Sequence, residues 1–306
     1  EGILRGEWGF KGMVMTDWSS GNNGGAQIAA GNDLIMPGNK QRYNEIVAAL
    51  EDGSLTMADV DRDVTRILEF VKRTPRFQGY KYSDNPDLEA HAQVTRQSSL
   101  EGMVLLKNDD SALPFTSKVS NVALFGYTSF DFIAGGTGSG SVHSSYVVSL
   151  LEGLKNGGYN VDERLKDANL AMKSTEIKRD ILSVVGRPEE LIPDSKTLAS
   201  MAEDNDIAVI TFGRISGEGN DREVAKGDLL LSDTEVRDIL ACQKKYEKFL
   251  LVLNTGGMVD LSPVAEEVEN ILILSQLGVE TGAALADVLL GKAYPSGKLT
   301  TSWAFE

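Results

Sequence analysis

Near the middle of the 306-residue chain lies Ile207-Ala208-Val209-Ile210-Thr211-Phe212, a stretch that is apolar at all but one position. Three further runs, 122–125, 249–253 and 271–275, have the same character. Each run is continuous rather than alternating, which is typical of strands that are buried on both faces. The sequence therefore predicts an α/β fold in which helices cover a mostly parallel sheet.

Helix signals fall between and after these runs. Ser232 and Glu235 form a capping box, with which a helix is expected to begin. A final helix is expected to end near Leu290, because Gly291 follows it directly.

The first seventy-odd residues predict strand, loop, strand, helix and helix. Apolar runs at 12–16 and 33–36 are expected to form strands of βα units. Thr56, with Asp59 three residues later, predicts the start of a helix whose apolar residues share one face. A closed barrel needs about 250 residues, so we expect this part to pack against something outside the sequence.

Composition limits the classes of function. The formal net charge is −15, and the acidic residues are spread along the chain. Such a surface repels phosphate groups, so we expect no nucleic-acid partner and expect a neutral substrate instead. No apolar run approaches the roughly 20 residues of a membrane span, so no membrane association is expected. Cys242 is the only cysteine, which excludes an internal disulfide and favours a cytoplasmic location over secretion. The chain opens with Glu1 rather than Met, so its natural beginning is expected upstream.

Two carboxyl groups follow predicted strands. Asp17 comes after the run 12–16 and precedes Trp18, whose indole could stack on a sugar. Catalytic groups gather at the carboxyl ends of parallel strands, but an Asx turn or a helix N-cap is the alternative for Asp17. Glu218 follows the run at 207–212 between two glycines, and the alternative there is a solvated turn with Asp221 as a helix cap.

A glycine-rich loop at 135–140 resembles a phosphate-binding loop but fails both known spacings, so a nucleotide-binding domain is the weakest interpretation. We expect instead that this loop brings the backbone and hydroxyl of Ser139 close to a polar ligand. His91 and His143 are the only histidines, and neither has a metal-ligand spacing or supports a Ser-His-Asp site. No metal and no cofactor is expected.

Taken together, these segments resemble glycoside hydrolase family 3. The resemblance runs nearly from end to end, in the family's order, through 9–18 (GFKGMVMTDW), 31–38 (GNDLIMPG), 101–108 (EGMVLLKN) with 113–114 (LP), 136–140 (GTGSG), 216–222 (SGEGNDR), 286–289 (ADVL) and 295–299 (PSGKL).

The resemblance implies three parts: the end of a (β/α)8, TIM-like barrel at 1–73, a linker and connecting helix at 74–108, and an α/β sandwich domain at 109–306. It implies that Asp17 is the nucleophile and Glu218 the acid/base of a retaining glycosidase. Trp18, Ser139 and Arg222 would contact the sugar.

Trp18 after the nucleophile fits a β-glucosidase better than a xylosidase. Double displacement requires carboxyl groups about 5 to 5.5 Å apart and a raised pKa at Glu218. The substrate would be a β-glucoside or oligosaccharide. An N-terminal barrel half, from the same longer chain or a second polypeptide, would be needed, and a homo-oligomer is compatible with the sequence. The alternative is a non-catalytic carbohydrate-binding or scaffolding remnant.

Overall fold

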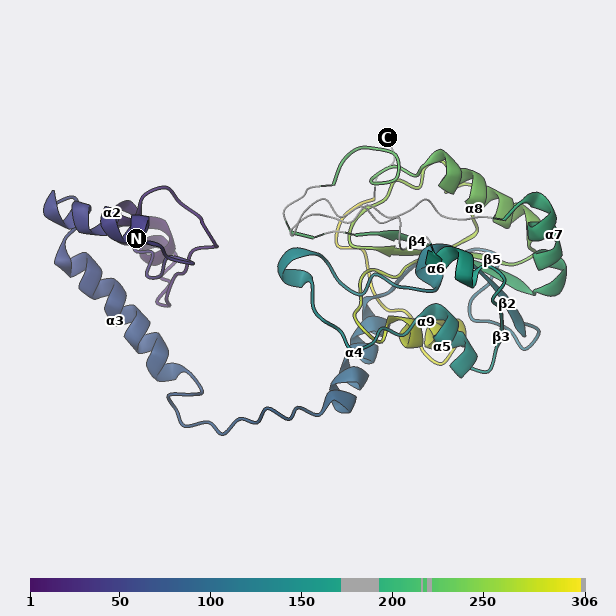
Figure 1. Ribbon diagram of the computed structural model, residues 1–306, viewed down its shortest axis with the longest axis horizontal. Coiled ribbons are helices and arrows are strands. Elements are labelled where there is room, and N and C mark those ends of the chain that lie inside the picture. Colours follow the sequence, from purple (N-terminus) through teal and green to yellow (C-terminus); the bar gives the residue numbers. More distant parts are fainter. Residues whose placement is uncertain (172–192, 216, 219–221, 304–306) are drawn as a thin grey trace. The chain divides into compact units, whose positions relative to one another are not determined.

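The computed structural model describes residues 1–171, 193–215, 217–218 and 222–303. It divides into two compact units, Glu1–Pro86 and Asp87–Glu306, and each is described by itself (Figure 1). The predicted α/β fold with a mostly parallel sheet is confirmed in the second unit. No helix in the described part of the chain is both long and apolar enough to cross a membrane.

The second unit is built on one six-stranded sheet with the order β1-β6-β5-β4-β2-β3. All neighbouring strands are parallel except β1, which runs antiparallel to β6 at one edge. The four apolar runs of the sequence form four of these strands. The bounds are β1 (Val104–Asn108), β2 (Asn121–Phe125), β3 (Asn160–Asp162), β4 (Ile207–Arg214), β5 (Phe249–Thr255) and β6 (Asn270–Ile273).

Helices cover both faces of this sheet (Figure 1). One face carries α4 (Leu88–Gly102), α5 (Leu150–Asn156) and α9 (Thr281–Leu289), and the other carries α7 (Ser195–Asp204) and α8 (Asp233–Lys245). The short helix α6 (Lys166–Ala171) follows β3 and packs Leu170 against the core on the α5 and α9 side. Short 3-10 turns lie at Tyr127–Ser129 and Gly138–Gly140.

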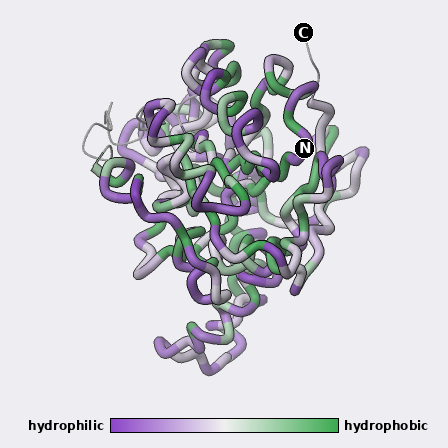
Figure 2. The backbone as a smooth tube through the Cα atoms, turned by 90° about the vertical axis from the view of Figure 1, so that its right-hand side faces the viewer, coloured by the Kyte–Doolittle hydropathy of each residue, from purple (hydrophilic) through white to green (hydrophobic). Residues whose placement is uncertain are grey.

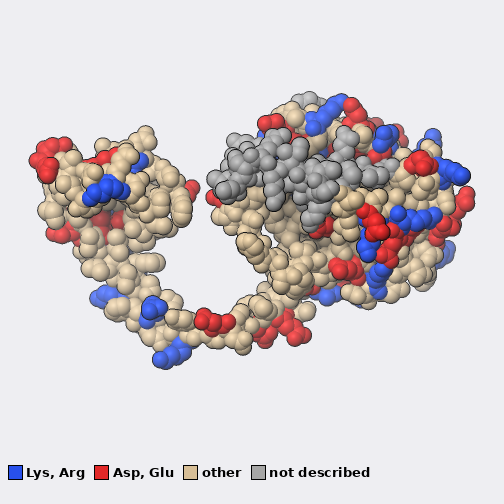
Figure 3. Space-filling view, viewed as in Figure 1, with Lys and Arg blue, Asp and Glu red and all other residues tan. Residues whose placement is uncertain are grey.

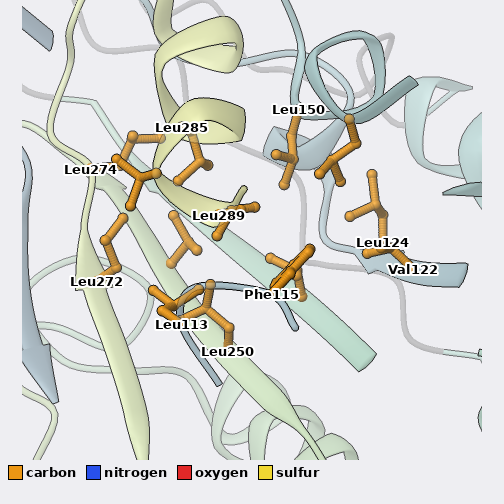
Figure 4. Packing of buried hydrophobic residues seen from close by; sticks show 14 of the residues in the cluster. Leu113, Phe115, Val122, Leu124, Leu150, Leu250, Leu272, Leu274, Leu285 and Leu289 are labelled. Atoms are coloured by element: carbon orange, nitrogen blue, oxygen red, sulfur yellow. The ribbon is translucent and has the colours of Figure 1, made fainter. Parts of the chain in front are cut away.

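Each central strand contributes side chains to two separate cores, which explains why its sequence is continuously apolar. In β4, Val209 packs with the α5 and α9 side, and its neighbour Ile210 packs with the α7 and α8 side. Figure 4 shows the first core, where Leu285 and Leu289 of α9 meet Leu272 and other strand residues. Each fully buried leucine stabilises the fold by about 1.5–3 kcal/mol.

The predicted helix ends are observed. Ser232 and Glu235 form the capping box of α8, and the last helix ends at Leu289, one residue before the expected end. Figure 3 shows acidic and basic side chains interspersed over the drawn face of this unit, with no extended basic patch on its described part.

The first unit consists of a π-helical turn (Gly2–Glu7) followed by α1 (Gly24–Ala29), α2 (Lys40–Glu51) and α3 (Met57–Arg73). The two strands expected here reduce to one isolated parallel bridge between Met15 and Leu34. Among the described residues, the runs 12–16 and 33–36 pair only with each other and have no further strand beside them. A longer ladder therefore does not form within this part of the described chain. The bridge is held by buried Asp33, which accepts hydrogen bonds from Arg5 Nη2 (2.6 Å) and Val14 N (2.7 Å).

Helix α3 begins at the predicted cap, where Thr56 and Asp59 form a capping box. Its apolar residues share a face as expected, but Met57, Leu68 and Val71 are exposed. The segment 74–86 contains no helix or strand, and Figure 1 draws it as an irregular trace. The lowest part of the tube in Figure 2 is coloured mainly as hydrophilic.

Candidate active site

The loops that follow the parallel strands gather at the carboxyl edge of the sheet, and Asn254 at the end of β5 joins two of them. Its side chain is fully buried. The amide oxygen accepts a hydrogen bond from Ile133 N at 2.7 Å, and Nδ2 donates to Ile133 O at 3.1 Å and to Ser275 O at 2.6 Å. Asn254 therefore fixes the loop after β2 against β5 and the end of β6.

Buried hydroxyl groups fix the same loop to β4. Thr128 Oγ1 donates to Thr211 Oγ1 at 2.8 Å, and Ser129 Oγ lies 2.8 Å from the same oxygen. Ser129 Oγ also donates to Phe125 O at 2.7 Å. All three hydroxyl-bearing residues are fully buried, so these bonds form away from water. The start of the loop that leads to Ser139 is therefore held rigidly.

Further along this loop, Ser139 meets Glu218. Ser139 N donates to Glu218 Oε2 at 2.5 Å, and Glu218 N lies 3.5 Å from Thr137 O as a second, weaker hydrogen bond. The glycine-rich loop and the loop after β4 were separate candidates in the sequence, and the structure brings them together.

Two glycines permit this close approach. Gly138 has φ +66°, in the left-handed region, and a Cβ atom at this position would collide with Cβ of Glu218. A Cβ atom on Gly217 would collide with the hydroxyl and backbone nitrogen of Thr137. The glycines on each side of the contact are therefore required by its geometry.

The hydrogen bonds from Ser139 shift the pKa of Glu218. The Ser139 backbone amide, followed by its hydroxyl, lowers the pKa of Glu218 below its ordinary value of 4.5, because both donors favour the carboxylate. The side chain is exposed, so desolvation opposes this only weakly. Within this unit the shift therefore differs in direction from the raised pKa that the proposed acid step requires.

Arg222 lies in the loop after β4, which also carries Glu218, and is held there by an acidic neighbour. Its Nε forms an ion pair with Asp228 Oδ1, and Asp228 Oδ2 accepts from Glu223 N at 2.7 Å. Among the described residues, Nη1 and Nη2 of Arg222 have no hydrogen-bond partner. Ser216 and residues 219–221 lie outside the described residues, and so does the alternative role of Asp221 as a helix cap.

The base of this loop is held by Arg214 at the end of β4. Its Nη2 pairs with Glu235 Oε2 at 2.6 Å, and its Nε donates to Asp228 O at 2.9 Å. Arg214 and Glu235 are both buried. The loop that carries Glu218 is thus fastened to the sheet and to the start of α8.

In the first unit, Asp17 lies where the chain leaves the bridge at Met15. Thr16 N donates to Leu34 O at 3.0 Å, and the exposed Asp17 carboxylate accepts from Trp18 N at 2.6 Å. The alternative role of Asp17 as the cap of the next helix is wrong, because Asn23 caps α1. Trp18 is 70% exposed, which leaves its ring available for stacking.

The structure thus brings Ser139 to Glu218 and Trp18 to Asp17. The two carboxyl groups belong to different units, so their separation stays a prediction. Among the residues described, no cluster of three His, Cys, Asp or Glu side chains could hold a metal ion. Sequence reasoning missed Asn254 and Thr211, although a polar residue directly after the apolar run 249–253 was a usable signal for Asn254.

Comparison with known proteins identifies the relatives of both units. The chain matches the model of the glycosyl hydrolase family 3 N terminal domain over residues 1–70 and that of the family 3 C-terminal domain over residues 103–306. Beta-glucosidase 3B from Thermotoga neapolitana, solved in complex with glucose, is 41% identical over 98% of this chain, with a TM-score of 0.91.

Curated relatives agree with these two family models. Thermostable beta-glucosidase B from Acetivibrio thermocellus is 30% identical over 98% of the chain, and an exo-alpha-(1->6)-L-arabinopyranosidase from Bifidobacterium longum is 28% identical over the same share. The chain spans 38% of the length of these two relatives and 44% of the Thermotoga structure. A family model covers most of the chain and a second covers its beginning, so the chain belongs to glycosyl hydrolase family 3.

Proposed function

We propose that this chain carries both catalytic carboxyl groups of a retaining β-glucosidase. The observation that carries the proposal is the likeness to the glucose-bound Thermotoga neapolitana enzyme, at 41% identity over 98% of the chain. The exposed positions of Asp17, shortly after the bridge at Met15, and of Glu218, in the loop after β4, support it.

In the first chemical step, Asp17 acts as the nucleophile. Its ionised carboxylate attacks the anomeric carbon and forms a covalent bond there as the glycosidic C–O bond breaks. The Trp18 amide hydrogen bond orients this carboxylate. Glu218, in its protonated form, gives its proton to the departing oxygen of the aglycone.

In the second step, Glu218 acts as a base. It accepts a proton from a water molecule whose oxygen bonds to the anomeric carbon, and the bond to Asp17 breaks. Two displacements at one carbon return the original configuration, so the product is β-glucose. The carboxylate form that Ser139 stabilises is the form needed for this second step.

Trp18, Ser139 and Arg222 are proposed to contact the sugar. The exposed ring of Trp18 offers an apolar face for stacking. The Ser139 hydroxyl lies beside the proposed acid/base, and the guanidinium of Arg222 is a donor for sugar hydroxyls. A neutral glucoside is also compatible with the net charge of −15.

The relatives are longer than this chain, which supports a need for further barrel strands. We therefore propose that an N-terminal barrel half, in the same or another polypeptide, completes the sugar pocket. A hybrid that places this chain behind the N-terminal region of the Thermotoga neapolitana enzyme supplies such a half.

The test is hydrolysis of 4-nitrophenyl β-glucoside by the chain alone and by the hybrid, with Asp17→Asn as the matched inactive variant. We expect activity in the hybrid, loss of that activity in Asp17→Asn because the amide cannot act as the nucleophile, and β-glucose as the first product in an NMR time course. The 4-nitrophenyl α-L-arabinopyranoside serves as a competing substrate.

A folded hybrid that binds glucose but hydrolyses no glycoside would favour the carbohydrate-binding alternative. An α-anomeric first product would contradict the double displacement. Faster turnover of the arabinopyranoside would reject glucose as the preferred sugar.

A further inference from the structure

We propose that Ser139 is a positioning residue, presented by the left-handed turn at Gly138, which seats the Glu218 carboxylate in a fixed orientation. This inference rests on the proposed function, in which Glu218 is the acid/base. It gives Ser139 a second role beyond contact with the sugar, and that role acts through Glu218.

The seat is formed by three consecutive residues of the glycine-rich loop. Thr137 accepts from Glu218 N, Gly138 leaves room for the Glu218 side chain, and Ser139 N donates to Glu218 Oε2 at 2.5 Å. Gly217 completes the fit from the other loop, because any side chain there would strike Thr137. Backbone groups provide both of these hydrogen bonds and the Ser139 hydroxyl adds a further donor, so the turn creates the main contacts of the seat.

The seat is rigid because its loop is fastened to the sheet. The Asn254 side chain holds the loop at Ile133, and Thr128 holds it nearer to β2. Glu218 itself has glycine before it and lies on an exposed loop, so its position depends on the seat rather than on its own strand. A positioned backbone amide therefore orients an otherwise exposed carboxyl group.

The seat acts differently on the two chemical steps. An N–H donor stabilises a carboxylate, which favours the base form used in the second step. It disfavours the protonated form needed in the first step, so Glu218 must gain its proton from a competing influence, such as the negative charge of the nucleophile. Loss of the seat should therefore raise the pKa of Glu218 and leave its carboxyl group poorly oriented.

The first experiment measures the seat without measuring activity. The 13C carboxyl resonances of labelled glutamate are titrated in the 306-residue chain, and Glu218→Gln assigns the signal of Glu218. We expect a pKa below 4.5 in the wild type, in line with the seated carboxylate. Gly138→Ala should move this pKa upward, because its methyl group displaces Glu218.

The matched control is Gly140→Ala, two residues further along the same loop. A Cβ atom there meets nothing within 4 Å, and its backbone lies outside the left-handed region. This variant should titrate as the wild type does. Equal pKa values in Gly138→Ala and Gly140→Ala would overturn the proposed seat, and Ser139→Ala, which keeps the amide donor, should give a smaller shift than Gly138→Ala.

The second experiment connects the seat to catalysis in the active hybrid. Dinitrophenyl β-glucoside has a leaving group that needs no protonation, and methyl β-glucoside has one that does. Positioned acid catalysis contributes about 10²–10⁴-fold, so Gly138→Ala should lower kcat/KM for the methyl glucoside on the order of 10-fold more than for the dinitrophenyl glucoside. The basic limb of its pH profile should move to higher pH.

The two experiments distinguish a failure of this inference from a failure of the proposed function. A shifted pKa in Gly138→Ala with equal losses on both substrates would show that the seat exists but that Glu218 is not the acid, which contradicts the proposed function. An unshifted pKa contradicts the inference itself, whatever the kinetics of the hybrid.

Discussion

Replacement of Asn254 by alanine tests how the candidate active site is supported. The side chain is fully buried and makes three hydrogen bonds, two with Ile133 and one with Ser275. The variant removes all three bonds and leaves an amide N–H and two carbonyl groups without these partners. Because the lost partner held the loop after β2, the change should reach Ser139 and Glu218.

The expected magnitude follows from these bonds. At about 1 kcal/mol net for each hydrogen bond, Asn254→Ala should lower the free energy of unfolding by about 3 kcal/mol. For a unit of this size, each kcal/mol lowers Tm by roughly 2–4 °C, so a decrease of about 6–12 °C is expected. Thermal unfolding followed by circular dichroism measures it, and the 13C titration of Glu218 should show a pKa nearer to 4.5.

Asn270→Ala is the matched control at the other end of the sheet. Asn270 lies at the start of β6 and is equally buried. Its side chain donates a hydrogen bond to Phe249 O at 2.8 Å. It should also destabilise the unit but leave the titration of Glu218 unchanged. If Asn254→Ala unfolds like the wild type, or if both variants shift the titration equally, the assignment of Asn254 as the support of this loop is refuted.

Three other predictions concern stability. Leu250→Ala empties part of the core in Figure 4 and should cost about 2–5 kcal/mol in urea unfolding, whereas an unchanged midpoint would contradict its packing. Ser149→Ala removes the α5 capping box and should cost about 1 kcal/mol, with Ser149→Thr restoring most of it. Hydrogen bonds from Arg42 and then the Gly24 amide lower the pKa of Glu45 to about 2, so its stabilisation is present above pH 4.5 and is lost towards pH 2. Glu45→Gln should therefore destabilise the first unit at pH 6 more than at pH 3, and equal effects in urea unfolding would contradict this.

The sheet was predictable where both faces of a strand are buried. The runs at 207–212 and 249–253 show this burial directly in their sequence. Strand β3 was missed because it has three residues at the sheet edge and only partial burial, so no continuous apolar run marks it. The N-terminal strands were predicted too long, because an apolar run alone does not supply a neighbour with which to form a ladder.

Individual residues of the candidate site could be named from the sequence, but the contacts between them could not. Asp17 and Glu218 follow apolar runs, yet spacing alone left each with a structural alternative, and the family resemblance gave them their roles. The contact between Ser139 and Glu218 joins positions 79 residues apart, so no local pattern reveals it. The role of Asn254 likewise depends on loops that meet only in the folded unit.

The contacts of Arg214 bear on how the sequence around Glu218 can vary. Arg214 bonds to Asp228 fourteen positions later and to Glu235 at the start of α8, so both ends of the loop between Arg214 and Asp228 are fixed. We expect insertions or deletions within this loop to leave strand pairing and helix docking unchanged. Sequence changes in this loop can therefore alter the surroundings of Glu218 while the sheet and α8 keep their contacts.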